Sequence, residues 1–264
     1  MYKQEPSLLQ VAHAFESIID EVIFIIGPAF TIGASVALFP EAGPIVAMLF
    51  LLFGTFMLTS RVDTEPIVDI QKNVRRFIIK SSSLRIVVLV LTAVGSIFGA
   101  IDVAVIAYAS KSGSGILASI MLSLYAAGAC VAGVCLGALP LRGSAAQRLL
   151  AGVIFMFILA IPLMFASNST LLAVMLFFAG LPNALTISTS MLLVGQAIPS
   201  ARLTEAMTWA STGITIGVAL GAGVGGMAID IAGDRAAFAV ALASGVIAIV
   251  VTVGGYRTLS RTGA

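Results

Sequence analysis

The sequence predicts an all-α membrane protein, a polytopic bundle of eight transmembrane helices. Of its 264 residues, 59% are apolar and only 10% are charged, and the mean hydropathy is +1.12. Soluble domains carry roughly 45–50% apolar and about 25% charged residues. Eight apolar segments are long enough to cross a hydrocarbon core, which takes roughly 17 to 25 helical residues. No segment has the alternating pattern of a membrane β-barrel.

Short connections and one long charged loop separate the eight predicted helices. The short connections at residues 40–43 and 166–170 indicate antiparallel neighbours. The helices are expected at residues 22–39, 42–58, 86–110, 116–141, 149–166, 171–198, 206–229 and 236–253.

The charged loop, residues 61–85, divides the chain into three predicted units. It holds six of the fourteen Lys and Arg residues and three of the twelve acids, so it cannot lie in hydrocarbon. Residues 1–60 would supply two helices, residues 61–85 a central loop, and residues 86–264 a six-helix bundle. Because basic residues that flank a span tend to stay cytoplasmic, we expect the loop and both termini in the cytoplasm. Twelve of the fourteen basic residues then lie inside, and only Lys111 and Arg235 lie outside.

Several classes of function find no support in the sequence. One His, two Cys and no nucleophile or phosphate-loop motif predict a protein that is not an enzyme and needs no metal or cofactor. The small net charge of +2 and the absence of a basic face argue against nucleic acid as a partner. Cys130 and Cys135 lie in one apolar run, where we expect them to be buried as small hydrophobic residues.

Acids at the start of the first predicted helix allow two interpretations. Glu16 and Asp20 fall on one helical stripe, because a step of four residues stays on one face. They could belong to the solvated cytoplasmic end of the helix. Alternatively, they could pair with basic loop residues as part of a cytoplasmic gate, since acids near membrane depth usually face a partner or a cavity.

Asp102 is the most informative single residue. It lies within the apolar run 86–110, past its middle, where an ionised acid costs roughly 2.5 to 3.5 kcal/mol at midspan. We expect its side chain to face protein or water. It could serve in coupling, contact a substrate or form a buried structural pair.

Two further helices carry patterned residues. The seventh predicted helix has a ladder at every fourth residue, which suits close helix packing. The ladder comprises Glu205, Trp209, Gly213, Gly217, Gly221 and Gly225. In the sixth helix, Pro182, Asn183 and Thr186 interrupt the apolar pattern, and such a helix is tolerated where it lines a cavity or meets neighbours.

With these residues in view, the chain resembles the major facilitator superfamily, in particular bacterial drug and sugar efflux-type members. The segment AFESIIDEVIFIIGPAF (14–30) is similar to the approach to the fifth helix of such transporters, with Gly27 and Pro28 at the core of its antiporter motif. Similarities to the seventh, tenth and eleventh helices lie in FGAIDVAVIAYAS (98–110), GLPNA (180–184) and TEAMTW (204–209). Arg142 belongs to a stretch that resembles the cytoplasmic loop motif, although Leu141 replaces its acid.

The resemblance implies the fold and the function. The chain would supply the equivalents of helices five to twelve, without the first four, and would lie in the bacterial plasma membrane. It would export a small organic molecule against proton entry by alternating access. Its partners would be the lipid bilayer, the substrate and a separate fragment that carries the missing helices. The alternative is a truncated, non-transporting membrane protein or interaction scaffold.

Overall fold

The computed structural model describes residues 41–60, 81–111, 115–138, 143–199 and 202–262, and scattered positions from 19 to 39. Within them, seven helices are long and apolar enough to cross a membrane. These seven confirm seven of the eight predicted spans. The first predicted span, residues 22–39, is described only in part, and its described positions up to residue 37 are helical.

The helices begin and end where local residues change the backbone hydrogen bonding. Ser144 and Gln147 form a reciprocal capping box at the start of α5, and Asn168 caps α6 by accepting from the Leu171 amide at 2.8 Å. A 3-10 turn, η3, follows α5 because Pro162 has no backbone N–H to continue the helix. The helices are α2 (Ala42–Thr59), α3 (Ser82–Lys111), α4 (Gly115–Ala138), α5 (Ala145–Ala160), η3 (Ile161–Phe165), α6 (Ser169–Ala197), α7 (Leu203–Ala232) and α8 (Ala236–Thr262).

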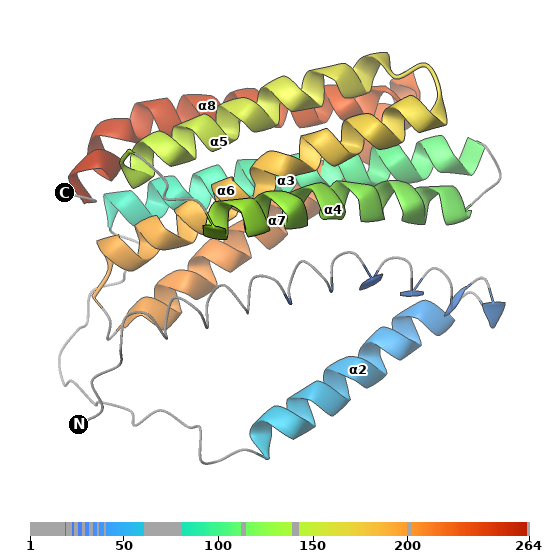
Figure 1. Cartoon of the computed structure of the whole chain (residues 1–264), viewed down its shortest axis with the longest axis horizontal. Coiled ribbons are helices and arrows are strands. Elements are labelled where there is room, and N and C mark those ends of the chain that lie inside the picture. The colour runs from blue at the N-terminus through green and yellow to red at the C-terminus, as the bar shows by residue number, and fades with distance from the viewer. Residues whose placement is uncertain are drawn as a thin grey trace.

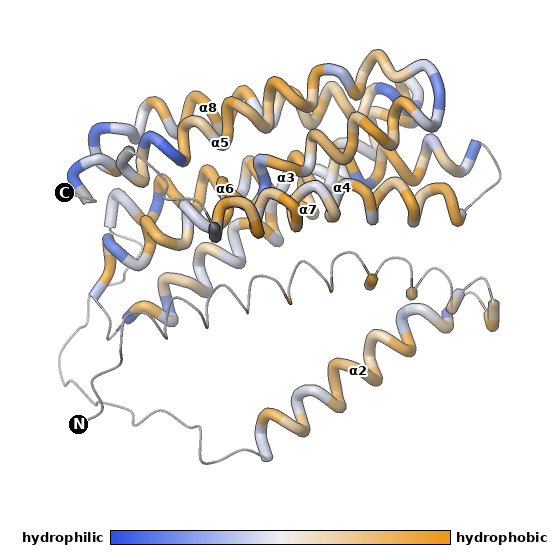
Figure 2. The backbone as a smooth tube through the Cα atoms, in the orientation of Figure 1, coloured by the Kyte–Doolittle hydropathy of each residue, from blue (hydrophilic) through white to orange (hydrophobic). Residues whose placement is uncertain are grey.

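Helices α3 to α8 form one bundle (Figure 1), in which α3 runs parallel to α7 and α4 runs parallel to α6. The closest neighbours are α3 with α7 and α8, α4 with α6, and α5 with α6 and α8. Figure 2 shows apolar residues along the helices and hydrophilic residues mainly near their ends. Such a distribution is expected of helices that cross a hydrocarbon core and reach water on both sides.

Helices α3 and α7 approach each other closely along a seam of glycines. The four glycines of the predicted ladder, from Gly213 to Gly225, are all buried in α7. A Cβ at Gly217 would collide with the Thr92 carbonyl, and one at Gly221 with the Ser96 carbonyl. From the other side, a Cβ at Gly99 would collide with the Val218 carbonyl. Larger residues at these positions would therefore push the two backbones apart.

Helices α4 and α6 also approach each other closely at glycines, at two positions. A Cβ at Gly128 of α4 would meet the Phe177 carbonyl, and one at Gly180 of α6 would meet the Tyr125 carbonyl. Gly180 therefore brings the backbone of α6 against α4 at the turn that carries Tyr125. This contact positions the polar residues of the two helices described below.

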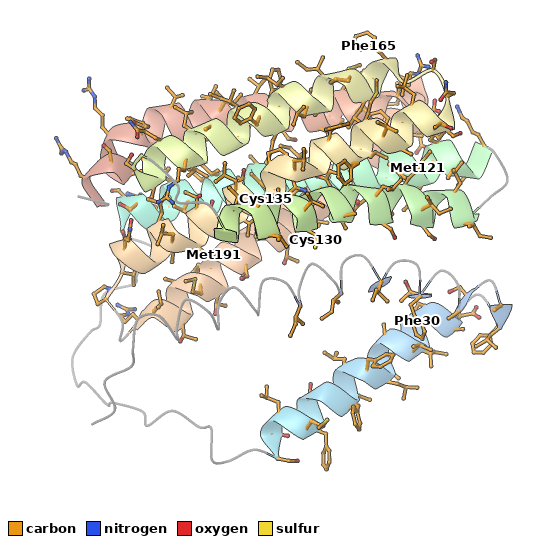
Figure 3. All side chains as sticks on the ribbon, in the orientation of Figure 1. Phe30, Met121, Cys130, Cys135, Phe165 and Met191 are labelled. Carbon is orange, nitrogen blue, oxygen red and sulfur yellow. The ribbon has the colours of Figure 1, made fainter. Side chains whose placement is uncertain are left out.

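Helix α2 lies apart from the six-helix bundle (Figure 1). Of its residues only Ala42 and Gly43 are buried. The described part of the preceding helical segment contacts it, because the Gly43 amide donates to the Ser35 hydroxyl at 3.1 Å and the rings of Phe30 and Phe50 meet edge to face. Figure 3 shows Phe30 on this side of the molecule, away from α3 to α8. Residues 61–80 of the predicted central loop lie outside the described residues.

Both cysteines are on α4 (Figure 3). They are free thiols, and Cys130 is half-buried while Cys135 is exposed. The prediction that both are buried is therefore wrong for Cys135. The reason is physical: an apolar side chain on a membrane helix gains from leaving water whether it meets protein or lipid, so hydropathy does not report which one it faces.

Candidate functional site

Tyr125 of α4 and Asn183 of α6 meet inside the bundle, close to the turn of α3 that carries Asp102. The Tyr125 hydroxyl of α4 donates to Oδ1 of Asn183 of α6 across 3.5 Å, which is long for such a bond. The Tyr125 ring packs on Phe98 of α3, one helical turn before Asp102. Tyr125 and Asn183 are buried, whereas Asp102 is half-buried. We call these three residues the polar cluster.

Helix geometry shows which way Asp102 points. It follows Phe98 by four residues and Gly99 by three, and residues at these spacings share one side of a helix. The Phe98 ring meets the Tyr125 ring of α4 edge to face, with centroids 6.3 Å apart, while Gly99 packs on α7. Asp102 therefore projects between α4 and α7, and its half-buried state indicates that this side of α3 is partly open.

No described side chain neutralises Asp102. Within the described part of the chain it makes no ion pair and no hydrogen bond, and the basic side chains of α3 to α8 all lie in the first or last two turns of their helices. Asp102 lies about 13 Å along the axis from Lys111, at about 1.5 Å per residue. A structural pair with a basic side chain thus has no candidate among the residues described.

Helix α6 also carries buried hydroxyls that lie elsewhere. The Thr186 hydroxyl donates to the Pro182 carbonyl at 2.8 Å, and the Ser190 hydroxyl donates to the Thr186 carbonyl at 2.7 Å. Thr186 is fully buried, and it packs against Gly152 of α5. Thr186 therefore faces α5, whereas Asn183 joins the polar cluster.

Helix α7 exposes a stripe of hydroxyls opposite its glycine seam. Thr204, Thr208, Ser211 and Thr215 line an open groove of about 470 Å³ along the first half of the helix. The Thr208 and Thr215 hydroxyls donate to the carbonyls of Thr204 and Ser211. These two hydroxyls are therefore paired within α7, and Met207, Thr212 and Ile216 complete the lining of the groove.

An ion pair joins the end of α3 to the turn between α7 and α8. Lys111 Nζ lies 2.9 Å from Asp234 Oδ1, and Arg235 donates to the Ala166 carbonyl after η3 at 3.1 Å. The hydrogen bond from Lys111 lowers the pKa of Asp234 below its ordinary value. Together these contacts hold the end of α3, the α7–α8 turn and the end of η3 on one side of the bundle.

The Lys111–Asp234 pair should stabilise the bundle slightly at neutral pH. Because the folded pKa of Asp234 is lowered, its contribution is present above the unfolded pKa of about 3.9 and is lost as pH falls through the folded value. Lys111 is exposed and Asp234 is half-buried at the surface, so Asp234→Asn should cost at most about 1 kcal/mol. Thermal unfolding between pH 3 and 7 measures this, with Asp230→Asn as control. A difference from wild type that grows in acid would contradict the assignment.

A comparison with known protein families matches residues 86–262, from α3 through α8, to the Major Facilitator Superfamily. The chain belongs to the major facilitator superfamily. Proteins of this superfamily are membrane transporters and not enzymes, so the match supports a general role in membrane transport. Comparisons with curated proteins and with solved structures gave no significant match.

The superfamily match confirms the broad resemblance, but it begins at residue 86 and leaves out the predicted site residues of the first helix. Gly27 is helical, and its carbonyl accepts from the Thr31 hydroxyl at 2.8 Å. Glu205 forms an ion pair with Arg202 at 2.8 Å, and Trp209 is exposed. Neither side chain is buried as the glycines that follow them on α7 are. Glu16, Asp20, Pro28 and Arg142 lie outside the described residues.

Sequence reasoning missed Tyr125 and Phe98. Aromatic residues are ordinary in apolar helices, so neither interrupted a pattern. A useful signal was the glycine three residues after Tyr125, Gly128, because small residues at a helix interface indicate which side of α4 meets its neighbour. Within the described residues, no three His, Cys, Asp or Glu side chains gather to hold a metal ion.

Proposed function

We propose that this member of the major facilitator superfamily exports a small organic molecule in exchange for protons, with Asp102 as the coupling residue. The observation that carries the proposal is the half-buried carboxylate of Asp102, which has no partner in the described chain and lies one helical turn from Phe98, whose ring packs on buried Tyr125. Ionisable residues inside a membrane are costly and usually mark a substrate or proton route. A carboxylate that is not committed to a fixed cation is free to bind and release a proton.

The open sides of α3 and α7 support alternating access. In this mechanism two bundles rock against each other around a site near the bilayer midplane. We propose that α3, α4 and α7 face the opposing bundle, because Asp102 projects between α4 and α7 and the hydroxyl groove of α7 is open. Residues 1–60 would contribute two helices to that opposing bundle, and four further helices would complete it.

Proton-driven flux tests the proposed function. The chain, alone and co-expressed with a fragment that supplies four further helices, is placed in everted membrane vesicles. Uptake of radiolabelled tetraethylammonium and of radiolabelled lactose is then followed after acidification of the lumen. We expect one of them to accumulate and the accumulation to collapse with nigericin. Uptake no greater than in vesicles without the chain, in both preparations, would favour the non-transporting alternative.

The orientation in a bacterial plasma membrane is part of the proposal. Five of the seven described basic residues lie at the end of the bundle where α3 begins, and the other two are Lys111 and Arg235. The positive-inside bias therefore favours a cytoplasmic position for the start of α3.

Cysteine labelling tests this orientation. In a background with Cys130 and Cys135 replaced by Ala, a single cysteine at Ser110 should react with an impermeant maleimide added to intact cells. One at Ser82 should react only after the cells are opened. Both positions are exposed at opposite ends of α3, so each is the control for the other. Labelling in the reverse order would overturn the orientation.

A further inference from the structure

We propose that Asp102, Phe98 and Tyr125 form a binding site for an organic cation, a compound with a positively charged centre and apolar substituents. The inference rests on the proposed function in that it assigns a substrate class to the same carboxylate. The juxtaposition that carries it is one acid beside two aromatic rings, on the partly open side of α3 between α4 and α7.

The charge of the site selects the sign of the ligand. Asp102 has no described counter-ion, whereas Asp234 is paired with Lys111 and Glu205 with Arg202. An anionic ligand would be repelled by the carboxylate, and a neutral ligand would displace water from it without replacing the lost solvation. A cation would supply the missing opposite charge.

The rings suit the apolar part of such a ligand. Phe98 precedes Asp102 by one helical turn, and its ring stands edge to face against Tyr125. Ring faces attract cations, most strongly where water is excluded. The Tyr125 hydroxyl donates a hydrogen bond to Asn183, and Gly180 brings the α6 backbone against α4 at this turn. Helix α6 therefore holds the Tyr125 ring in place.

The seams of the bundle define the side from which a ligand would enter. Gly95 and Gly99 bring α3 against the α7 backbone, which leaves no room for a ligand within that seam. Tyr125 and Asn183 are buried toward α6, while the Asp102 side chain is half-buried. A ligand would therefore reach the carboxylate from the side of α3 between α4 and α7.

Equilibrium binding of tritiated tetraphenylphosphonium to the purified chain in detergent tests the site without requiring transport. We expect saturable binding that Asp102→Asn weakens at least about ten-fold. Phe98→Leu should weaken it several-fold, and Tyr125→Phe, which keeps the ring, should change it less. Asp230→Asn, at an exposed acid near the end of α7, is the matched control and should bind as the wild type does.

Competition on the wild-type chain gives a second readout that needs no variant to fold. Tetraphenylborate has nearly the same shape as tetraphenylphosphonium and the opposite charge, so it should compete poorly. Equal competition, no saturable binding, or full affinity in a folded Asp102→Asn variant would each overturn the proposal. Cation binding without proton-driven flux would support the binding site and contradict the proposed function. Proton-driven flux of lactose without cation binding would support the proposed function and contradict the binding site.

Discussion

Asp102→Asn is expected to abolish proton-driven flux while leaving the bundle folded. Asn keeps the size of the side chain but cannot exchange a proton, so substrate movement in response to a pH gradient should fall to the level of vesicles without the chain. Asp102→Glu keeps the carboxyl group and is the matched control, which should retain part of the flux.

The stability of the same variant separates this role from a structural one. Breaking a buried ion pair by removing one partner costs roughly 3 to 5 kcal/mol, because the other charge is left uncompensated. Asp102 has no ion pair in the described chain, so we expect Asp102→Asn to unfold at nearly the wild-type temperature. A large loss of stability would indicate a structural partner, and a stable variant with normal proton-driven flux would defeat both interpretations.

Gly217→Leu is expected to destabilise the bundle strongly. A side chain at this position would collide with the Thr92 carbonyl of α3, which is backbone and cannot rotate away. Overpacking a well-packed interior typically costs about 1 to 3 kcal/mol and sometimes more, and here two helices must separate. Thermal unfolding in detergent measures the loss, and Gly221→Leu, which meets the Ser96 carbonyl, should behave alike.

Helix α7 offers a matched control for that experiment. A Cβ at Gly223 has no neighbour within 4 Å, and the residue is exposed on the same helix. Gly223→Leu should therefore leave the unfolding temperature unchanged or raise it, since Leu also has the higher helix propensity. If the variants at Gly217 and Gly223 unfold alike, the close approach of α3 and α7 does not limit the stability of the bundle.

Much of the fold could be predicted because the hydrocarbon thickness sets the length of each apolar segment. The predicted limits differ from the helices mainly where a helix continues into water. Helix α3 starts at Ser82, before the predicted limit at residue 86, and α8 runs to Thr262, beyond residue 253. Hydropathy measures the part of a helix that prefers lipid, and capping and side-chain packing decide where the backbone stops being helical.

The candidate site could be predicted only in part. Asp102 and Asn183 were recognisable because each interrupts an apolar run, but their connection through Tyr125 joins residues on three helices. Thr186 looked equivalent to Asn183 in the sequence, yet Thr186 packs against Gly152 of α5 whereas Asn183 accepts a hydrogen bond from Tyr125 of α4. Which neighbour each side of α6 meets is set by the packing of the whole bundle, and local spacing does not contain it.

Proton movement tests the central claim most directly. The chain, with the four-helix fragment if flux requires it, is reconstituted into liposomes that contain a pH-sensitive dye, and tetraethylammonium is added outside without an initial pH gradient. Exchange at Asp102 predicts that the cation enters as protons leave, so the lumen becomes alkaline, and that Asp102→Asn gives no such change. Entry of the cation with no change in luminal pH, or an unchanged response in Asp102→Asn, would contradict proton exchange at this carboxylate.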